Sequence, residues 1–340
     1  MIIFERGGLL TTVQDLGRVG YQKFGMPAAG VMDPFAMQLA NILVGNEQNE
    51  AVLEVTLLGP VIRFQEPVVF AVCGGDFQPR LNGVPIENNR AWEAPAGGRL
   101  ELSAVRSGAR GYIAFSGGLA VEPVMGSCST CLKAAIGGLE GRAVKDGDQI
   151  GLKAPRSLSQ LEKRAAPAGF GPQYSKEPVV RFTFGPQDEC FTQAGKDCFV
   201  NSAYVVDSKS DRMGFRLSGP EIEKAPGSSG NIISDGICFG SIQVTNGQPI
   251  VMMADRQTVG GYPKIGCVIT ADLPLMAQLK GGDKVRFLPV SIQQAQKADL
   301  AQQKLLSNLK AQLDRPLFPE SRYNVIVNGK RYEVSVSRAK

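Results

Sequence analysis

Residues 249–270 read PIVMMADRQTVGGYPKIGCVIT, and this stretch carries the clearest signals of the fold. Its apolar runs PIVMMA and IGCVIT contain the β-branched residues that favour strands. Between them, residues 255–263 form an insert longer than the about two to five residues of a hairpin turn. The stretch therefore predicts two strands joined by a loop whose many donors and acceptors do more than reverse the chain.

Similar apolar runs, bounded by Gly, Pro or Asn, recur along the chain. They are VVFAVCGG (68–75), RLELSAV (99–105), GYIAFSGG (111–118), VVRFTFGP (179–186), PIVMMA (249–254) and KVRFLPV (284–290). Short strands at this spacing favour β-barrels or sandwiches over βαβ units. One early helix is predicted after Asp33, which can cap it, with Pro34 in its first turn and Gly45 at its end.

The strand pattern stops between residues 154 and 177, where Pro, Ala, Ser and charged residues predominate. We therefore expect a first β domain at 1–153, a linker at 154–177 and a second β domain at 178–290. Two motifs occur in the same order in both halves, which indicates two tandem copies of one β domain. The motif xRxG-aromatic-xxxG stands at 17–25 and 211–219, and K-[DG]-G-D stands at 145–148 and 280–283.

The tail, residues 291–340, divides into a helix and a hairpin. The predicted helix, 291–313, has apolar residues at helical spacing, namely Ile292, Ala295, Leu306, Leu309 and Leu313. Residues 323–336 alternate around Asn328-Gly329, a strong hairpin signal. A lone hairpin is marginal in water, so this one needs something to pack against.

Composition excludes several classes of protein. The 340 residues are 43% hydrophobic and 20% charged, which is typical of a globular chain of about two domains. No apolar run reaches the ~18 residues of a membrane span, and Glu5 and Arg6 interrupt any signal-like start, so we expect a cytoplasmic protein without a membrane segment. The absence of histidine rules out a Ser-His-Asp triad, and there is no Walker A loop.

The net charge of +5 does not indicate nucleic-acid binding. Residues 291–340 hold nine Lys/Arg and four acidic residues, so the first 290 residues carry 28 charges of each sign. A nucleic-acid protein is expected to carry its basic stripe on the folded body. We therefore expect no nucleic-acid partner.

The seven cysteines mostly lie in apolar runs, where cysteine behaves as a small buried hydrophobe. Cys128 and Cys131 form a single CxxC without a second pair, which is weak evidence for zinc or redox work. We interpret this spacing as chance.

The insert 255–263 and the strand before it hold the densest polar groups of the second half. Strand alternation places Ser241 and Gln243 on one face, and the Gly260-Gly261 amides can approach a ligand closely. For any single residue, a capped turn on the surface is the simpler interpretation; for the cluster we favour function.

Four long motifs resemble the carboxyltransferase / allophanate-hydrolase-subunit-2 family. They are TVQDLGRVGYQKFGMPAAGVMDPFAMQLANILVGN (12–46), SDRMGFRLSGP (210–220), SDGICFGSIQVTNGQPIVMMADRQTVGGYPKIG (234–266) and AQLKGGDKVRF (277–287). The resemblance implies a mainly β protein of two tandem cyclophilin-like β-barrel domains, with the C-terminal helix and hairpin as an addition. It also implies a partner, the B-type (KipI-like) subunit, with the active site near their junction.

Two departures from the family qualify this resemblance. Where relatives usually have GSRSTDL, residues 126–132 read GSCSTCL, so a charge pair is missing there. The hairpin at 323–336 resembles the lead-in to a biotinyl carrier domain, yet no Met-Lys-Met biotinylation motif occurs. Biotin, if used, would therefore arrive on a separate carrier protein and would not be bound covalently to this chain.

The first hypothesis is the C-type subunit of an ATP-dependent 5-oxoprolinase, which opens the lactam to glutamate with ATP and Mg²⁺ and with B-type and A-type (LamB/YcsF-like) subunits. On motif positions, the catalytic candidates are Asp255, Gln257 and Tyr262, with Tyr262 as proton donor. Candidates for substrate binding are Arg18, Asn41, Arg212, Ser241, Gln243, Thr258, Gly260 and Gly261. Asp76 and Asp235 are the candidates for the metal.

Two alternatives to this hypothesis stay open. A carboxyltransferase receiving carboxybiotin would need amide or hydroxyl donors for the ureido oxygen, which Ser241, Gln243, Gln257 and the Gly260-Gly261 amides could supply. A non-enzymatic KipA-like regulator would need only its partner surface.

Overall fold

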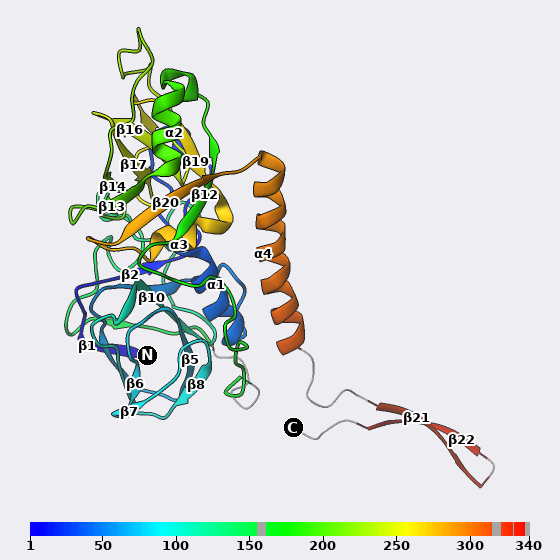
Figure 1. Cartoon of the computed structure of the whole chain (residues 1–340). Coiled ribbons are helices and arrows are strands. Elements are labelled where there is room, and N and C mark those ends of the chain that lie inside the picture. Colours follow the sequence, from blue (N-terminus) through cyan, green and yellow to red (C-terminus); the bar gives the residue numbers. More distant parts are fainter. Residues whose placement is uncertain (155–160, 315–320, 329, 337–340) are drawn as a thin grey trace.

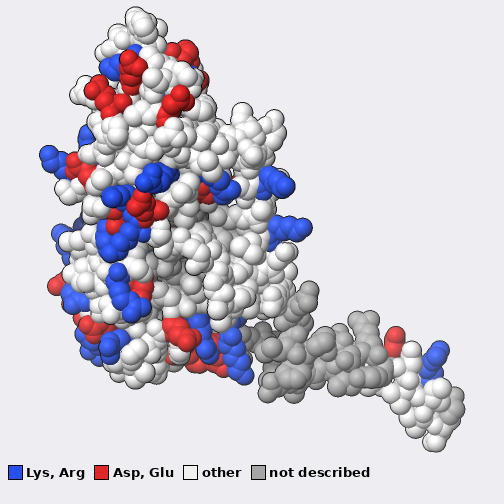
Figure 2. All heavy atoms as spheres, in the orientation of Figure 1, with Lys and Arg blue, Asp and Glu red and all other residues white. Residues whose placement is uncertain are grey.

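The computed structural model describes residues 1–154, 161–314, 321–328 and 330–336, and shows two β-rich halves, one above the other (Figure 1). The mainly β prediction is confirmed. Within these ranges, no helix is both long and apolar enough to cross a membrane. On the face shown in Figure 2, basic and acidic side chains are interspersed over the folded body.

The first half contains two sheets. The six-stranded sheet has the order β11 (Gln149–Ile150), β1 (Ile2–Arg6), β4 (Val61–Phe64), β9 (Arg99–Glu101), β6 (Arg80–Leu81) and β7 (Val84–Pro85). The five-stranded sheet has the order β2 (Leu10–Gln14), β3 (Val52–Thr56), β10 (Ser107–Phe115), β5 (Val68–Asp76) and β8 (Ala91–Ala94).

Strand β5 has a continuous apolar sequence because both of its faces are buried. Phe70 and Val72 belong to the core between the two sheets, whereas Ala71 and Cys73 belong to a second cluster under helix α1 (Pro34–Leu43). The five-stranded sheet is thus buried on both faces, so alternate residues are equally apolar. Helix α1 begins as predicted, since the Asp33 carboxylate accepts a hydrogen bond from the Ala36 amide at 2.9 Å.

The second half is a closed barrel. Its strand order is β12 (Val179–Phe184), β19 (Lys264–Val268), β16 (Ser241–Thr245), β17 (Gln248–Met252), β14 (Gly214–Ser218), β13 (Ala203–Val206) and β20 (Lys284–Pro289). Strands β12 and β20 pair in parallel and close it. Helices α2 (Gln193–Asn201) and α3 (Leu273–Ala277) contribute Phe199 and Met276 to its core. Phe199 stacks on Phe287 with ring centroids 4.6 Å apart.

Of the two motifs shared by the halves, one forms the same structure in both halves and the other does not. Both K-[DG]-G-D motifs form the same turn, in which the final aspartate accepts a hydrogen bond from the amide of the lysine three residues earlier. Each turn leads into a strand, β11 or β20. The other motif marks no equivalent pair, because 214–218 is strand β14 whereas 17–25 is a loop around the short 3-10 helix η1 (Gln22–Phe24). Two further 3-10 turns are η3 (Asp188–Cys190) and η4 (Thr270–Asp272).

The part of the expected linker that the structure describes, residues 161–177, packs against the first half. Arg164 donates to the Ile42 carbonyl at 2.9 Å, and the Tyr174 hydroxyl donates to Asp33 at 2.7 Å. Residues 155–160 of that linker lie outside the described residues. The domain boundaries themselves remain a prediction.

The tail forms the predicted helix and hairpin. Helix α4 (Ile292–Leu313) buries only Leu306 and Leu309, which pack under α1, and Ile292 is exposed. Strands β21 (Ser321–Val327) and β22 (Lys330–Val336) pair with each other and project away from the two halves (Figure 1). Gly329 of the hairpin turn lies outside the described residues.

Candidate functional site

The insert 255–263 is not a free loop, because part of it forms a small two-stranded ribbon. Its strand β18 (Val259–Gly260) pairs antiparallel with β15 (Asp235–Gly236). The Gly261 carbonyl accepts a hydrogen bond from the Ile232 amide at 2.8 Å. A Cβ at Gly260 would lie 2.6 Å from both Gln243 Nε2 and Ile237 Cδ1, so the ribbon lies directly against the barrel.

A pocket of about 550 Å³ opens between this ribbon and the outer surface of the barrel. The barrel contributes Ser241 and Lys264, and the insert contributes Arg256 and Thr258. A loop of the first half adds Gln22 and Lys23. The remaining lining residues are Pro186, Asp235, Gly236, Ile237, Cys238, Val259, Gly266 and Cys267.

The pocket carries an excess of positive charge, with Lys23, Arg256 and Lys264 against the single carboxylate of Asp235. Lys264 is 4% exposed and lies 2.8 Å from Asp235. Arg256 is also buried and donates to the carbonyls of Ile237 at 3.2 Å and Met253 at 3.3 Å. Within the described ranges no carboxylate lies at salt-bridge distance from Arg256, so this guanidinium can receive an anion.

Strand β16 places two predicted residues as alternation requires. Ile242 and Val244 face the barrel core, so Ser241 and Gln243 share the outer face. Ser241 lines the pocket, whereas Gln243 is covered by the ribbon and donates to the Tyr262 carbonyl at 3.4 Å.

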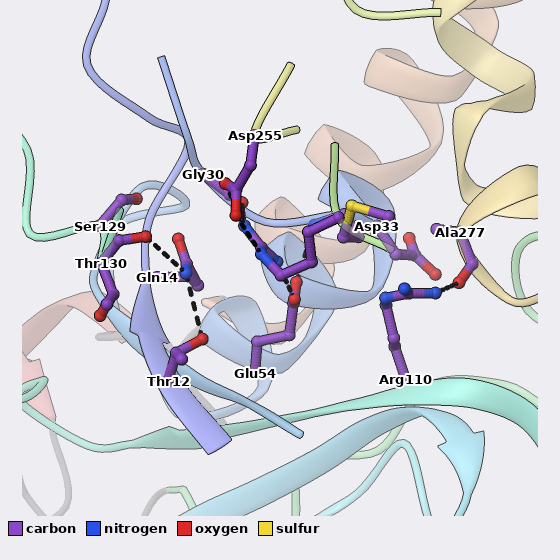
Figure 3. Close-up of polar contacts among 12 residues, drawn as sticks. Thr12, Gln14, Gly30, Asp33, Glu54, Arg110, Ser129, Thr130, Asp255 and Ala277 are labelled. Carbon is purple, nitrogen blue, oxygen red and sulfur yellow. Dashed lines mark hydrogen bonds and ion pairs between the residues drawn. The ribbon is translucent and has the colours of Figure 1, made fainter. Parts of the chain in front are cut away.

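Arg212 and Asp255 are brought together, but at the junction of the two halves and not in the pocket. Figure 3 shows Asp255 near Gly30 and Glu54 of the first half. Arg212 binds Asp255 through two nitrogens at 2.9 and 3.0 Å and also pairs with Glu54 of the first half. It donates to the Gly30 carbonyl at 2.5 Å. Burial alone would lower the pKa of Arg212, but the two carboxylates outweigh it and raise that pKa.

A second set of contacts fixes the same junction. Gln278 accepts from the amides of Ala109 and Arg110, each at 3.0 Å, and donates to Asp33 at 2.9 Å. Arg110 donates to the Ala277 carbonyl (Figure 3). The halves are therefore held in one arrangement, which fixes Lys23 of the first half beside the pocket of the second.

The other predicted residues of the first half lie elsewhere. Arg18 is fully buried and donates to the carbonyls of Val124 at 3.1 Å and Ser129 at 2.5 Å. Asn41 is buried on α1 and donates to the Glu50 carbonyl at 2.7 Å. Both side chains therefore donate hydrogen bonds to backbone carbonyls within the first half.

Gln257 and Tyr262 do not line the pocket, although they belong to the insert that forms its wall. Gln257 is half-buried, and Tyr262 is 42% exposed. Thr258 is the predicted polar residue of the insert that does line it. None of Asp255, Gln257 and Tyr262 lines the pocket, so their catalytic roles remain predictions.

The structure does not join the two predicted metal ligands. Asp76 ends strand β5 and pairs with Arg106, whereas Asp235 pairs with Lys264. No group of three or more His, Cys, Asp or Glu side chains that could hold a metal occurs among the residues described.

Sequence reasoning missed Arg256, Lys264, Cys238 and Cys267. No local signal placed Arg256 in the pocket, because it follows a turn in which its amide donates to the Met253 carbonyl at 3.2 Å, so strand alternation does not apply. Cys267 is opposite Ser241 in the pairing of β16 and β19, which sequence alone does not reveal.

The structure is that of a protein with two β-rich halves and a cationic pocket beside their junction. The chain belongs to the family described as "Carboxyltransferase domain, subdomain A and B", which matches residues 24–289.

Particular relatives narrow this class. The chain is 38% identical to the C-type subunit of 5-oxoprolinase from Escherichia coli (strain K12) over 312 residues, covering 91% of this chain and 97% of that protein. It is 33% identical to urea amidolyase of Lachancea kluyveri, covering 89% of this chain but 18% of that protein. The crystal structure of Kluyveromyces lactis urea carboxylase superimposes with a TM-score of 0.86 at 31% identity, over 91% of this chain and 29% of that chain.

Proposed function

We propose that this chain is the C-type subunit of an ATP-dependent 5-oxoprolinase and acts with a B-type and an A-type subunit in the cytoplasm. The observation that carries this proposal is the near end-to-end correspondence with the C-type subunit of the E. coli 5-oxoprolinase. The urea enzymes, by contrast, contain the matching region as a small part of a longer chain.

The pocket suits the proposed substrate. 5-Oxoproline carries one carboxylate and one lactam amide, so it needs a cation at one end and hydrogen-bonding groups at the other. Arg256 and Lys264 can receive the carboxylate, and the hydroxyls of Ser241 and Thr258 can reach the lactam. A pocket of about 550 Å³ is larger than this ligand alone requires, which leaves room for a group from a partner subunit.

The mouth of the pocket suits a protein partner. Phe24 is 73% exposed next to the lining residue Lys23, and Val259 of the lining is 54% exposed. These two side chains offer apolar area that a partner could cover. We assign this surface to the B-type subunit.

The reaction would be driven by ATP with Mg²⁺. Transfer of a phosphoryl group from ATP to the lactam oxygen would make that oxygen a leaving group. The described residues do not fit a metal site, since Asp76 and Asp235 are each paired with a different cation. We therefore derive no step through Mg²⁺ on this chain and assign ATP to the partner subunits. The role of this chain is to bind and orient 5-oxoproline.

Reconstitution with the B-type and A-type subunits tests the proposal through 5-oxoproline-dependent phosphate release. Arg256→Ala should lower kcat/KM by roughly 10- to 150-fold, the value of one charge-assisted hydrogen bond of about 1.5–3 kcal/mol. Arg256→Lys should retain part of the activity. Arg286→Ala, which removes an exposed pair with Glu177, is the matched control and should change little. Absence of 5-oxoproline-dependent phosphate release from the complete complex contradicts the proposal.

A biotin-dependent carboxyltransferase is the second candidate, favoured by the family description and by the similarity to urea carboxylase. Ser241 and Thr258 are hydroxyl donors available for a ureido oxygen in the same pocket. Avidin, which sequesters biotin, separates the two: it should leave phosphate release unchanged if the chain serves a 5-oxoprolinase.

A further inference from the structure

Cys238 and Cys267 share one wall of the pocket. The expectation that the cysteines are small buried hydrophobes is wrong for Cys238, because its side chain is exposed. Cys267 lies on β19, directly opposite Ser241, and Cys238 lies just before β16. The proposed binding of 5-oxoproline uses neither thiol.

The two sulfur atoms are close enough to react. Their Sγ atoms are 3.4 Å apart, so a movement of about 1.4 Å would bring them to the ~2.0 Å length of a disulfide. Cys238 Sγ is also 3.0 Å from the Ser241 hydroxyl. Both cysteines are free in this structure.

The surroundings divide the pair into an ionised and a protonated thiol. The contact between the two sulfur atoms, in which either thiol can be the donor, lowers the pKa of Cys238 to about 5, together with the Ser241 hydroxyl and the Arg256 charge. The same interaction and burial raise the pKa of Cys267. The lowered pKa favours the thiolate form of Cys238, whose side chain is exposed and lies beside the more buried Cys267, the arrangement of an attacking and a resolving cysteine.

We propose that Cys238 and Cys267 are a redox modification site, in which hydrogen peroxide converts the pair reversibly to a disulfide. The Cys238 thiolate attacks one peroxide oxygen, the O–O bond breaks, and hydroxide leaves with a proton from solvent as water. Cys267 then attacks the resulting sulfenic acid, the S–S bond forms, and a second water leaves. Two thiols are oxidised and one peroxide is reduced to two waters.

Formation of this disulfide changes the pocket. Cys238 joins the ribbon strand β15 to the barrel through residues 237–240, and Ile237 holds Arg256 through its carbonyl. Drawing Cys238 toward β19 therefore moves the carbonyl that orients the buried guanidinium. It also takes the thiolate away from Arg256 and Ser241, so the oxidised pocket should bind an anion with altered affinity.

Peptide mass mapping of the full-length protein after treatment with hydrogen peroxide tests the proposal without any substrate, so its outcome is independent of the proposed function. The intact mass should fall by about 2 Da, with peptides containing Cys238 and Cys267 linked, and dithiothreitol should restore it. Alkylation of Cys238 by iodoacetamide should already be rapid at about pH 6, where an ordinary thiol is protonated.

Variants separate the two roles. Cys267→Ser removes the resolving thiol, so peroxide should leave a sulfenic acid on Cys238 that dimedone traps. Cys238→Ser should abolish both the cross-link and the dimedone adduct. Cys131→Ser is the matched control and should behave like the wild type. The proposal is overturned if the cross-link joins other cysteines, such as Cys128 and Cys131, or if Cys238 is oxidised to sulfinic acid without any link to Cys267.

Discussion

Replacement of Arg212 by methionine should destabilise the protein strongly, because Arg212 binds the two halves together. Its side chain is 6% exposed, and those of Glu54 and Asp255 are 1% and 9% exposed. Removing the guanidinium leaves two buried carboxylates without a counter-charge. Breaking a buried pair in this way costs about 3–5 kcal/mol, which corresponds to a fall of about 4–7 °C in Tm for a chain of 340 residues that unfolds as one unit.

The assay is urea and thermal unfolding followed by circular dichroism, with matched variants. Arg286→Met breaks a pair whose side chains are 47% and 42% exposed and should cost less than about 1 kcal/mol. The triple variant Arg212→Met/Glu54→Gln/Asp255→Asn removes the Arg212 charge together with both of its paired carboxylates and should recover much of the loss.

The same variants decide what Arg212 and Asp255 do. If the pair is structural, the free energy of unfolding falls and the triple variant recovers stability together with pocket binding. If instead Arg212→Met unfolds like the wild type while 5-oxoproline-dependent activity disappears, the reasoning is refuted and Arg212 is a substrate residue.

Three other changes have defined outcomes. Burial raises the pKa of Asp33 above its usual 3.8, against the lowering effect of its hydrogen bonds; an acid with a raised folded-state pKa loses its stabilising contribution as pH rises. The stability of wild type minus that of Asp33→Asn, from urea titrations, should therefore fall as pH rises above the ordinary aspartate pKa of about 3.9, and a rise contradicts this assignment. Gly260→Ala places a Cβ 2.6 Å from the side-chain ends of Gln243 and Ile237, which can shift, and should lower the free energy of unfolding measured by urea titration by about 1 kcal/mol; a loss above about 3 kcal/mol means that the ribbon cannot yield. Leu309→Ala should cost about 2–3 kcal/mol and speed hydrogen exchange in α4, whereas Leu300→Ala, at a position 65% exposed, should do neither; equal effects contradict the packing of α4 under α1.

Local sequence signals are sufficient for most of the fold. The strand predicted at 68–75 is β5, Val68–Asp76, because apolar β-branched residues bounded by glycine have few alternatives to a buried strand. Helix α1 is predictable from its cap, since Asp33 and Pro34 together specify a helix start. Local motifs also identify the turn at 280–283, which depends only on contacts within four residues.

The site is less predictable because its residues meet across long stretches of chain. The motif suggests a catalytic Asp255, but its partner Arg212 is 43 residues away, and nothing local shows that this pair faces the first half. Arg256 faces the opposite way and enters the pocket, which depends on how the ribbon lies on the barrel. Lys23 reaches the same pocket only because the junction at Gln278 fixes the two halves.

The position of bound 5-oxoproline in the assembled complex is the most direct measurement of what this chain does. A crystal or cryo-EM structure of the chain with its partner subunits and 5-oxoproline should show the ligand carboxylate beside Arg256 and Lys264, with the B-type subunit over Phe24 and Val259. Ligand bound elsewhere, with this pocket open to solvent and no partner at its mouth, would contradict the assignment.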